Sequence, residues 1–193
     1  MKRSIFIFSA LLLIVIYLIS CNNPFSTRTP AIPPPQGGAV ILPPTSPEKV
    51  LNNLVESLRT KSIQDYMDVF SAPFTFSPDP LDSLKYEQEF RSSWNRDSES
   101  AFAMNFFIPD STFTISLTTY RNPEYNPGDR MYKYWYKLTF GKEENKEDVY
   151  GEAWFYFIEN SGNWSINLWV DHRGYPNDPQ KDSWGGVRAR YLF

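Results

Sequence analysis

The second half of the chain alternates apolar and polar side chains with a period of two, and this pattern constrains the fold more than any other feature. Alternate positions of a strand point to the same face, so each such stretch predicts a strand with one buried face, whereas residues 149–158 are apolar on both faces except at Glu152 and predict a more central strand. Segments rich in Asn, Gly, Pro and Asp separate the stretches and are typical of turns. The sequence therefore predicts an antiparallel meander of four strands, at residues 113–118, 132–140, 149–158 and 164–171.

The first half of the chain carries helical signals. Ser46 precedes Pro47, an order typical of a helix start, and apolar residues then recur at helical spacing through residue 58. A second helix is predicted to begin at Ser62, which together with Asp65 resembles a capping box. Pro73 is expected to end it, because proline disrupts a helix interior.

Three less regular segments complete the domain. Residues 74–76 predict a short extended piece, and residues 81–94 predict a third helix that buries Leu84, Phe90 and Trp94. Residues 98–108 allow one or two more helical turns, and the sequence leaves their structure open. The tail from residue 174 onward is punctuated by Gly and Pro.

The N-terminus resembles an export signal. Lys2 and Arg3 precede an uncharged apolar run that ends at Leu18-Ile19-Ser20-Cys21, and no Lys or Arg cluster follows it. A cysteine just after the cleavage point resembles the lipobox of bacterial lipoproteins. That resemblance implies that Cys21 is acylated and becomes the new N-terminus. An uncleaved membrane anchor and an ordinary signal peptide are the alternatives.

The chain divides into three parts. Residues 1–20 are interpreted as a lipoprotein signal peptide, residues 21–45 as a lipidated Pro-rich tether, and residues 46–193 as a single α+β domain. Because Cys21 is the one cysteine, the mature protein has no internal disulfide, and its own core must hold the fold. The predicted location is the bacterial cell envelope. Asn22, after the cysteine, resembles an outer-membrane sorting pattern of Gram-negative lipoproteins. In a Gram-negative cell the protein is therefore expected on the outer membrane, facing the periplasm or the surface.

Charge and composition limit the partners. The formal net charge is −3, and no Lys/Arg cluster stands out, so nucleic acid is not an expected partner. The expected partners are the membrane, through acylated Cys21, and an unidentified small ligand or envelope protein. A homodimer through the outer side of the meander, with Trp135 and Trp169 as anchors, is also predicted, because aromatic anchors concentrate in interfaces.

The order of elements resembles that of a known superfamily. Helices, a short strand, a further helix and four long strands form an α+β pattern, and the run from Asp65 to Phe70 is followed by the extended residues 74–76. The stretch 164–169, followed by Asp171, resembles a last strand. Together these features resemble the nuclear transport factor 2-like superfamily, which contains ketosteroid isomerase, scytalone dehydratase and polyketide cyclases. The resemblance implies N-terminal helices packed on a curved, mainly antiparallel sheet, with a pocket open at one end.

Few residues are candidates for chemistry in such a pocket. Superfamily enzymes use a pocket carboxylate, a Tyr donor or a His–Asp pair, so Tyr66, Asp171 and His172 are the weak catalytic candidates. Asp171 and His172 are neighbours on a strand and should point to opposite faces. His172 is therefore expected on the face of Ile166, Leu168 and Val170, as a rim or structural residue rather than a catalyst.

A group of aromatic residues is the candidate pocket wall or core, and both readings stay open. It comprises Tyr132, Tyr134, Tyr136 and Trp94. Asp171, Arg173, Arg188 and Arg190 predict ion pairs that pin the tail to the sheet, with an anion-binding rim as the alternative. A single histidine and a lipidated cysteine predict no metal site. The sequence contains no cofactor-binding motif, and no cofactor is expected to bind.

Three functions follow from this reading. The first is a lipid-anchored, non-catalytic binding or interaction module of the cell envelope. The second is an envelope enzyme that uses a cone-shaped pocket for proton transfer or dehydration. The third is a structural surface lipoprotein. The sequence leans against an enzyme because no convergent acid–base set is evident.

Overall fold

The computed structural model describes residues 40–108, 110–174 and 181–192. The predicted signal peptide, Cys21 and the tether as far as residue 39 lie outside the described residues. Within the described part of the chain, no helix is both long and apolar enough to cross a membrane.

The described domain is built on one mixed sheet. Its hydrogen-bonded order is β2-β1-β7-β6-β5-β3, and β4 also pairs with β5. The predicted four-strand meander is confirmed, because β3, β5, β6 and β7 pair antiparallel in that order, whereas β1 pairs parallel with β7. The strands are β1 (Phe70–Ser77), β2 (Trp94–Asn95), β3 (Phe113–Thr119), β4 (Glu124–Asn126), β5 (Met131–Lys142), β6 (Glu147–Asn160) and β7 (Asn163–Arg173).

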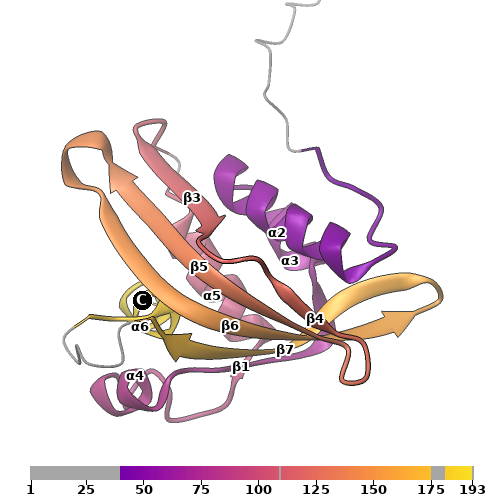
Figure 1. Cartoon of the computed structure of the whole chain (residues 1–193). Coiled ribbons are helices and arrows are strands. Elements are labelled where there is room, and N and C mark those ends of the chain that lie inside the picture. The colour runs from indigo at the N-terminus through magenta and orange to yellow at the C-terminus, as the bar shows by residue number, and fades with distance from the viewer. Residues whose placement is uncertain (1–39, 109, 175–180, 193) are drawn as a thin grey trace, which may run out of the picture. The chain divides into compact units, whose positions relative to one another are not determined.

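Helices cover one side of this sheet. In Figure 1 the sheet curves, α5 and α6 lie behind the strands and α3 lies behind α2, so the viewer faces the outer side of the meander. The α+β class with helices packed on a curved, mainly antiparallel sheet is therefore confirmed. The helices are α2 (Pro47–Thr60), α3 (Ile63–Asp68), α4 (Pro80–Lys85), α5 (Arg96–Phe106) and α6 (Trp184–Arg190), with a 3-10 turn, η1, at Glu143–Asn145.

The first two helices begin where the sequence predicts. Pro47 occupies the first turn of α2, although the Ser46 side chain makes no capping hydrogen bond. The Ser62 hydroxyl accepts from the Asp65 amide at 3.3 Å and caps α3, as predicted. Val50, Leu54 and Leu58 form the buried face of α2, each at most 1% exposed; burial of this stripe stabilises the helix more than its intrinsic propensity does.

The prediction of one helix over residues 81–94 is wrong, although Trp94 is buried as predicted, at 3% exposure. Only Pro80–Lys85 is helical, Leu84 is 75% exposed, and Trp94 pairs with Phe76 as part of β2. The reason is that α4 is anchored to the rest of the domain by a polar side chain and not by an apolar face. Asp82, at 0% exposure, is the buried residue of this helix. Residues 98–108, left open by the sequence, fall mostly within α5, whose N-cap is Asn95.

A bulge in β7 changes which side chains face the helices. Ile166 pairs with Phe157 whereas Leu168 pairs with Tyr156, so the alternation shifts by one residue between them. Trp169 and Asp171 are consequently buried with Ile166, while His172 is not. The predictions that His172 shares the face of Ile166, and that Trp169 anchors an outer-side dimer, are wrong. Trp169 is 0% exposed.

Candidate functional site

The concave side of the sheet is occupied by the C-terminal helix. Trp184 of α6 is 0% exposed, and its ring centroid lies 4.7 Å from that of Trp169 and 5.4 Å from that of Tyr136. The Arg188 guanidinium, one helical turn later, lies 4.0 Å from the ring centroids of both Phe76 and Trp169. Edge-to-face rings and a cation between aromatic faces are favourable contacts, so α6 is an integral part of the core.

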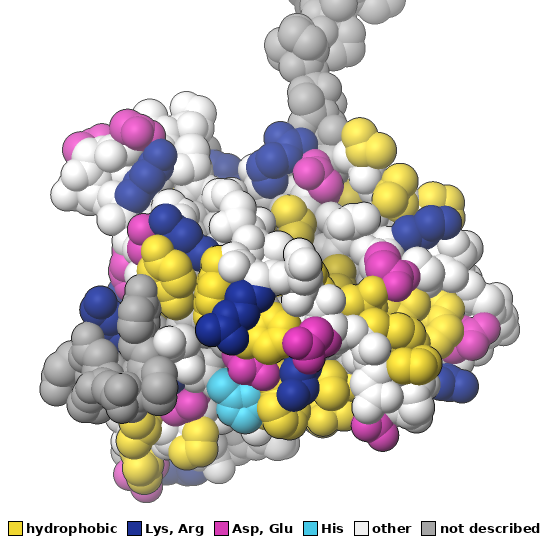
Figure 2. All heavy atoms as spheres, viewed as in Figure 1, with side chains coloured by type: hydrophobic (Ala, Val, Ile, Leu, Met, Phe, Trp, Pro, Cys, Tyr) yellow, Lys and Arg dark blue, Asp and Glu magenta, His cyan; other side chains and the backbone are white. Residues whose placement is uncertain are grey.

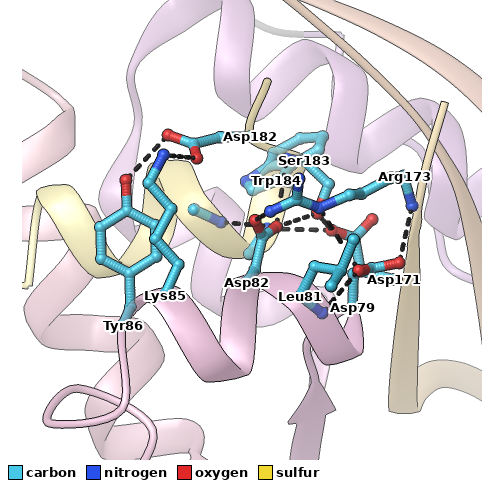
Figure 3. Close-up of polar contacts among 12 residues, drawn as sticks. Asp79, Leu81, Asp82, Lys85, Tyr86, Asp171, Arg173, Asp182, Ser183 and Trp184 are labelled. Carbon is cyan, nitrogen blue, oxygen red and sulfur yellow. Dashed lines mark hydrogen bonds and ion pairs between the residues drawn. The ribbon is translucent and has the colours of Figure 1, made fainter. Parts of the chain in front are cut away.

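The first buried polar cluster centres on Asp82. Its carboxylate accepts from Arg173 Nη2 and from the backbone amides of Ser183 and Gly186, the last two at 3.1 Å. Arg173 also pairs with Asp79, which lies 3.3 Å from its Nε atom. Figure 3 shows Asp82 between the Arg173 side chain and the start of α6. This cluster therefore joins α4, β7 and α6.

Asp171 lies beside this cluster, with a different set of donors. Its carboxylate accepts from the Tyr136 hydroxyl at 2.8 Å and from the Gly185 amide at 2.9 Å. Its Oδ2 atom also lies 2.6 Å from Ser183 Oγ, which in turn contacts Asp82. Burial raises the pKa of Asp171 to about 7, and the hydrogen bonds that its carboxyl group accepts from Gly185 and Tyr136 only partly oppose that rise.

A second buried cluster centres on Glu99 of α5. Arg188 donates to both of its carboxylate oxygens, at 2.8 and 2.9 Å, and the Trp94 indole donates at 2.7 Å. The Tyr66 hydroxyl also hydrogen bonds to Glu99. Burial raises the pKa of Tyr66 well above its ordinary value, and the Glu99 charge raises it further. The predicted candidates Tyr66 and Asp171 thus belong to two different clusters, which α6 bridges.

These clusters are closed to solvent. Tyr66, Glu99 and Asp171 are each 0% exposed, and each is hydrogen bonded within the protein. A pKa near 7 would suit a general base, but a base must also come within hydrogen-bonding reach of a substrate. With α6 in place, Asp171 has no such access.

The four aromatic residues predicted to line a pocket are divided by the structure. Tyr136 and Trp94 lie in the buried clusters described above. Tyr132 and Tyr134 instead line an open hollow of about 230 Å³, which is smaller than the roughly 300–1,000 Å³ of a typical ligand site. The Tyr132 hydroxyl donates to Glu48 at 2.5 Å, and this hydrogen bond lowers the pKa of Glu48. The remaining residues of the hollow are Leu51, Asn52 and Pro123.

His172 faces the opposite side of the sheet from Asp171, so the two form no dyad, as expected. Its ring lies 4.6 Å from that of Trp154, and its Nε2 atom has no hydrogen-bond partner within the described residues. The described ranges also contain no group of three His, Cys, Asp or Glu side chains placed to hold a metal ion.

His172 belongs to an aromatic surface that we call the outer face. Strand register aligns Trp135 with Glu152 and His172, and Lys133 with Trp154. Figure 2 shows this side of the molecule, with the cyan histidine among yellow hydrophobic and dark blue basic side chains. The aromatic members of the outer face are Tyr120, Trp135, Tyr150, Trp154 and His172.

Cations lie over these rings. Lys133 Nζ is 4.8 Å from the Trp154 ring centroid, and the Arg121 guanidinium is 5.7 Å from that of Trp135. Both indole N–H groups donate to Glu152, at 3.0 Å from Trp135 and 2.5 Å from Trp154. The outer face therefore presents positive head groups held on aromatic rings, while its central carboxylate already has partners.

The pinned tail was predictable from sequence in outline only. Arg188 and Arg190 form ion pairs that hold the C-terminal segment, with Arg190 bonded to Glu147 at 2.6 and 2.9 Å. Arg173 pairs with Asp79 and Asp82 instead, and Asp171 is held within the described residues by hydrogen bonds rather than by an ion pair. The sequence did not predict that Asp82 and Glu99 are the acidic partners. They lie on the short helices α4 and α5, whose apolar patterns are too brief for a buried carboxylate to stand out as an interruption. The pair Gly185-Gly186 was the available sequence signal that the start of α6 is closely packed. A Cβ at Gly186 would lie 2.5 Å from the Asp182 side chain.

Comparisons with known proteins identify the fold. No protein-family model matches the sequence, and no curated protein matches it. Among solved structures, the beta subunit of the benzoate 1,2-dioxygenase from Burkholderia mallei aligns with a TM-score of 0.52 at 13% identity, over 68% of this chain and 91% of that one. A protein of unknown function from Mycobacterium tuberculosis aligns with a TM-score of 0.52 at 11% identity, over 75% and 83%.

A third structure, AusH from Aspergillus nidulans, aligns with a TM-score of 0.50 at 10% identity, over 69% of this chain and 86% of that one. At these identities the likeness concerns the fold alone. The fold is that of the nuclear transport factor 2-like cone, and the resemblance predicted from the element order is confirmed at that level. Because one fold hosts many functions, these neighbours do not assign an activity.

Proposed function

We propose that this protein is a lipid-anchored, non-catalytic interaction module of the bacterial cell envelope, and that its outer face binds an acidic segment of a partner protein. One observation carries the non-catalytic part of the proposal. The side of the sheet that would form a pocket is filled by α6, with Trp184 and Arg188 each 0% exposed. The polar groups inside are therefore used to hold the fold.

Charge favours an acidic partner over a second copy of this chain. The protein as a whole carries a net charge of −3, yet the outer face presents Arg121 and Lys133. Glu152 keeps its negative charge while it accepts hydrogen bonds from the two indoles, and the charge of Asp148 is paired with that of Lys137 at 2.9 Å. Two such faces packed against each other would bring like charges together, which is unfavourable.

The type of surface favours a protein partner. Trp, Tyr and Arg are enriched in the cores of protein interfaces. The ring faces of Trp135 and Trp154 already lie under cations, and their N–H groups are already bonded, so neither is free to stack on or bond to a sugar. Cations held in place lose less conformational entropy when they bind a carboxylate.

The envelope location rests on the sequence. The apolar run ending at Ser20 and the lone Cys21 support acylation, and two or more acyl chains anchor a protein stably where one does not. The proximal end of the tether is fixed on the domain, because Asn53 of α2 bonds to both the amide and the carbonyl of Leu42, at 2.8 Å each. Mass spectrometry of the native protein should find an N-terminal acylated Cys21. An unmodified full-length chain would contradict the anchor.

The partner proposal is tested by titrating the full-length protein in detergent with a short poly-glutamate peptide. We expect the indole N–H signals of Trp135 and Trp154 to shift in NMR spectra, and those of Trp169 and Trp184 to stay unchanged. The charge reversal Lys133→Glu should weaken binding at least about tenfold. Arg91→Glu, which reverses an exposed charge bonded to Gln88, is the matched control.

Two outcomes would contradict the proposal. One is an unchanged spectrum, or an equal loss of affinity in Lys133→Glu and Arg91→Glu. The other is a stable homodimer that protects Trp135. The enzyme hypothesis has one observation in its favour, the raised pKa of Asp171, and it would require α6 to leave the concave side.

A further inference from the structure

We propose that Asp171 and Asp82 share a proton through Ser183, and that this proton fastens α6 into the concave side of the sheet, so that its loss loosens the helix. The proposal concerns the interior and does not depend on the outer face. Its consequence is a pH-sensitive latch on the segment that closes the cone.

The number of protons available limits which hydrogen bonds Ser183 can form with the two carboxyl groups. Ser183 Oγ lies within hydrogen-bonding distance of Oδ2 of both Asp82 and Asp171. A hydroxyl has one proton to donate, and an ionised carboxylate has none. One of the two contacts must therefore be a hydrogen bond from a protonated carboxyl group to Ser183 Oγ. If both carboxylates were ionised, one contact would place two acceptors together.

The other partners decide which carboxyl group holds the proton. Asp82 bonds to the Arg173 guanidinium and to two backbone amides, which all favour its ionised form. Within the described residues, no cation hydrogen bonds to Asp171. The raised pKa of Asp171 agrees with this assignment. The chain of donors therefore runs from the Asp171 carboxyl to Ser183 Oγ, and from Ser183 to Asp82.

Charged and titratable side chains reach the surroundings of Asp171 from β5, α6 and β7. Tyr136 of β5 donates a hydrogen bond and holds its proton, because burial raises the pKa of its hydroxyl well above the ordinary value. Arg188 of α6 acts on Asp171 only at a distance and is paired with Glu99. Arg173 of β7 faces Asp82 and Asp79 rather than Asp171.

This arrangement holds α6 directly. The residues that contact the shared proton are Ser183, the N-cap of α6, and Asp171, which also accepts from the Gly185 amide inside the helix. The Trp184 amide donates to Tyr136 at 2.8 Å, which extends the same network. When the proton leaves Asp171 for solvent, Ser183 can satisfy only one carboxylate, and a buried unpaired negative charge remains beside the helix start.

The direction of the pH effect follows from linkage. With α6 docked, Asp171 keeps its proton up to a pH of about 7. With α6 released, the carboxyl group meets water and loses its proton near its ordinary pKa of about 4. Docking is therefore strongest at low pH and weakens as the pH rises from about 4 to 7. Above pH 7 both states are ionised at Asp171, and the effect levels off.

The test is a pH titration of the full-length protein in detergent, followed by NMR. The carboxyl carbon of Asp171 should titrate near pH 7. The opening constant of the Val187 and Ala189 amides, corrected for intrinsic exchange, should rise about tenfold per pH unit between pH 5 and 7. Ser183→Ala removes the oxygen that accepts the Asp171 proton, a bond that favours the protonated form, so it should move the Asp171 midpoint downward. Ser92→Ala, at an exposed serine, should not.

Several results would overturn the proposal. A wild-type Asp171 that titrates below pH 5 would remove the shared proton. A corrected opening constant that does not change between pH 5 and 7 would remove the latch. An Asp171 midpoint that is the same in Ser183→Ala and wild type would remove Ser183 from the path. The first two measurements use only the wild-type protein, so they remain decisive if a variant fails to fold.

Discussion

Replacing Arg188 with methionine tests whether α6 belongs to the folded core. The Arg188 guanidinium and the Glu99 carboxylate are both 0% exposed and are joined by two hydrogen bonds. Methionine keeps an apolar stem between Phe76 and Trp169 but leaves Glu99 buried without a cation. Removing one partner of a buried ion pair costs about 3–5 kcal/mol, against a total domain stability of about 5–15 kcal/mol. We expect a loss of that size in the free energy of unfolding.

The assay is urea unfolding followed by tryptophan fluorescence. Arg190→Met is the matched control, because Arg190 and its partner Glu147 are 33% and 42% exposed and such a pair contributes about 0–1 kcal/mol. The double variant Arg188→Met with Glu99→Gln should recover a large part of the loss, because it removes the stranded charge. A loss below about 1 kcal/mol for Arg188→Met, or equal losses for both arginines, would refute the placement of α6.

Three other predictions concern the same fold. Because the folded-state pKa of Asp171 is about 7 and its ordinary value is about 4, the folded state binds the extra proton between those values. Stability should therefore fall as the pH rises, by about 1.4 kcal/mol per unit between pH 5 and 7, and a wild-type slope in urea unfolding no steeper than that of Asp171→Asn would contradict it. Gly186→Ala should destabilise by about 1–3 kcal/mol, despite alanine's higher helix propensity, because its Cβ would lie 2.5 Å from Asp182 side-chain carbons; a melting temperature equal to or above wild type would be the opposite result. Leu84→Glu should change the unfolding free energy by less than about 0.5 kcal/mol, since Leu84 is 75% exposed, whereas a loss of several kcal/mol would restore the buried position that the sequence predicted.

The sequence predicted the sheet well because strand periodicity is a local property. The alternation at 132–140 corresponds to the one-sided burial of β5, and the run at 149–158, which is apolar on both faces, corresponds to β6 in its place between β7 and β5. The same logic failed after Ile166, because one extra residue in β7 reverses the faces of Trp169 and His172. A bulge of this kind leaves no signature in the alternation of apolar and polar residues.

The candidate site was harder to predict because its contacts are long-range. Asp82 and Ser183 are 101 residues apart in sequence, and Glu99 and Arg188 are 89 apart. A pattern of apolar residues cannot show which acidic side chain accompanies a buried arginine. Arg173 and Arg188 were predicted to form ion pairs, but their partners Asp82 and Glu99 lie on α4 and α5. The sequence predicted the wrong extent for the first of these helices and left the second open. Tyr66 and Asp171 were named as weak catalytic candidates, and the structure places them in two separate buried clusters.

The most direct test of the account is the proximity of Trp184 to Trp169 in solution. The closed cone places their ring centroids 4.7 Å apart, with both side chains 0% exposed. NMR of the full-length protein at pH 5 should therefore show nuclear Overhauser contacts between the two indole rings. If those contacts are absent and the Trp184 indole N–H exchanges at the rate of a free peptide, α6 does not fill the concave side, and the proposal of a non-catalytic module fails with it.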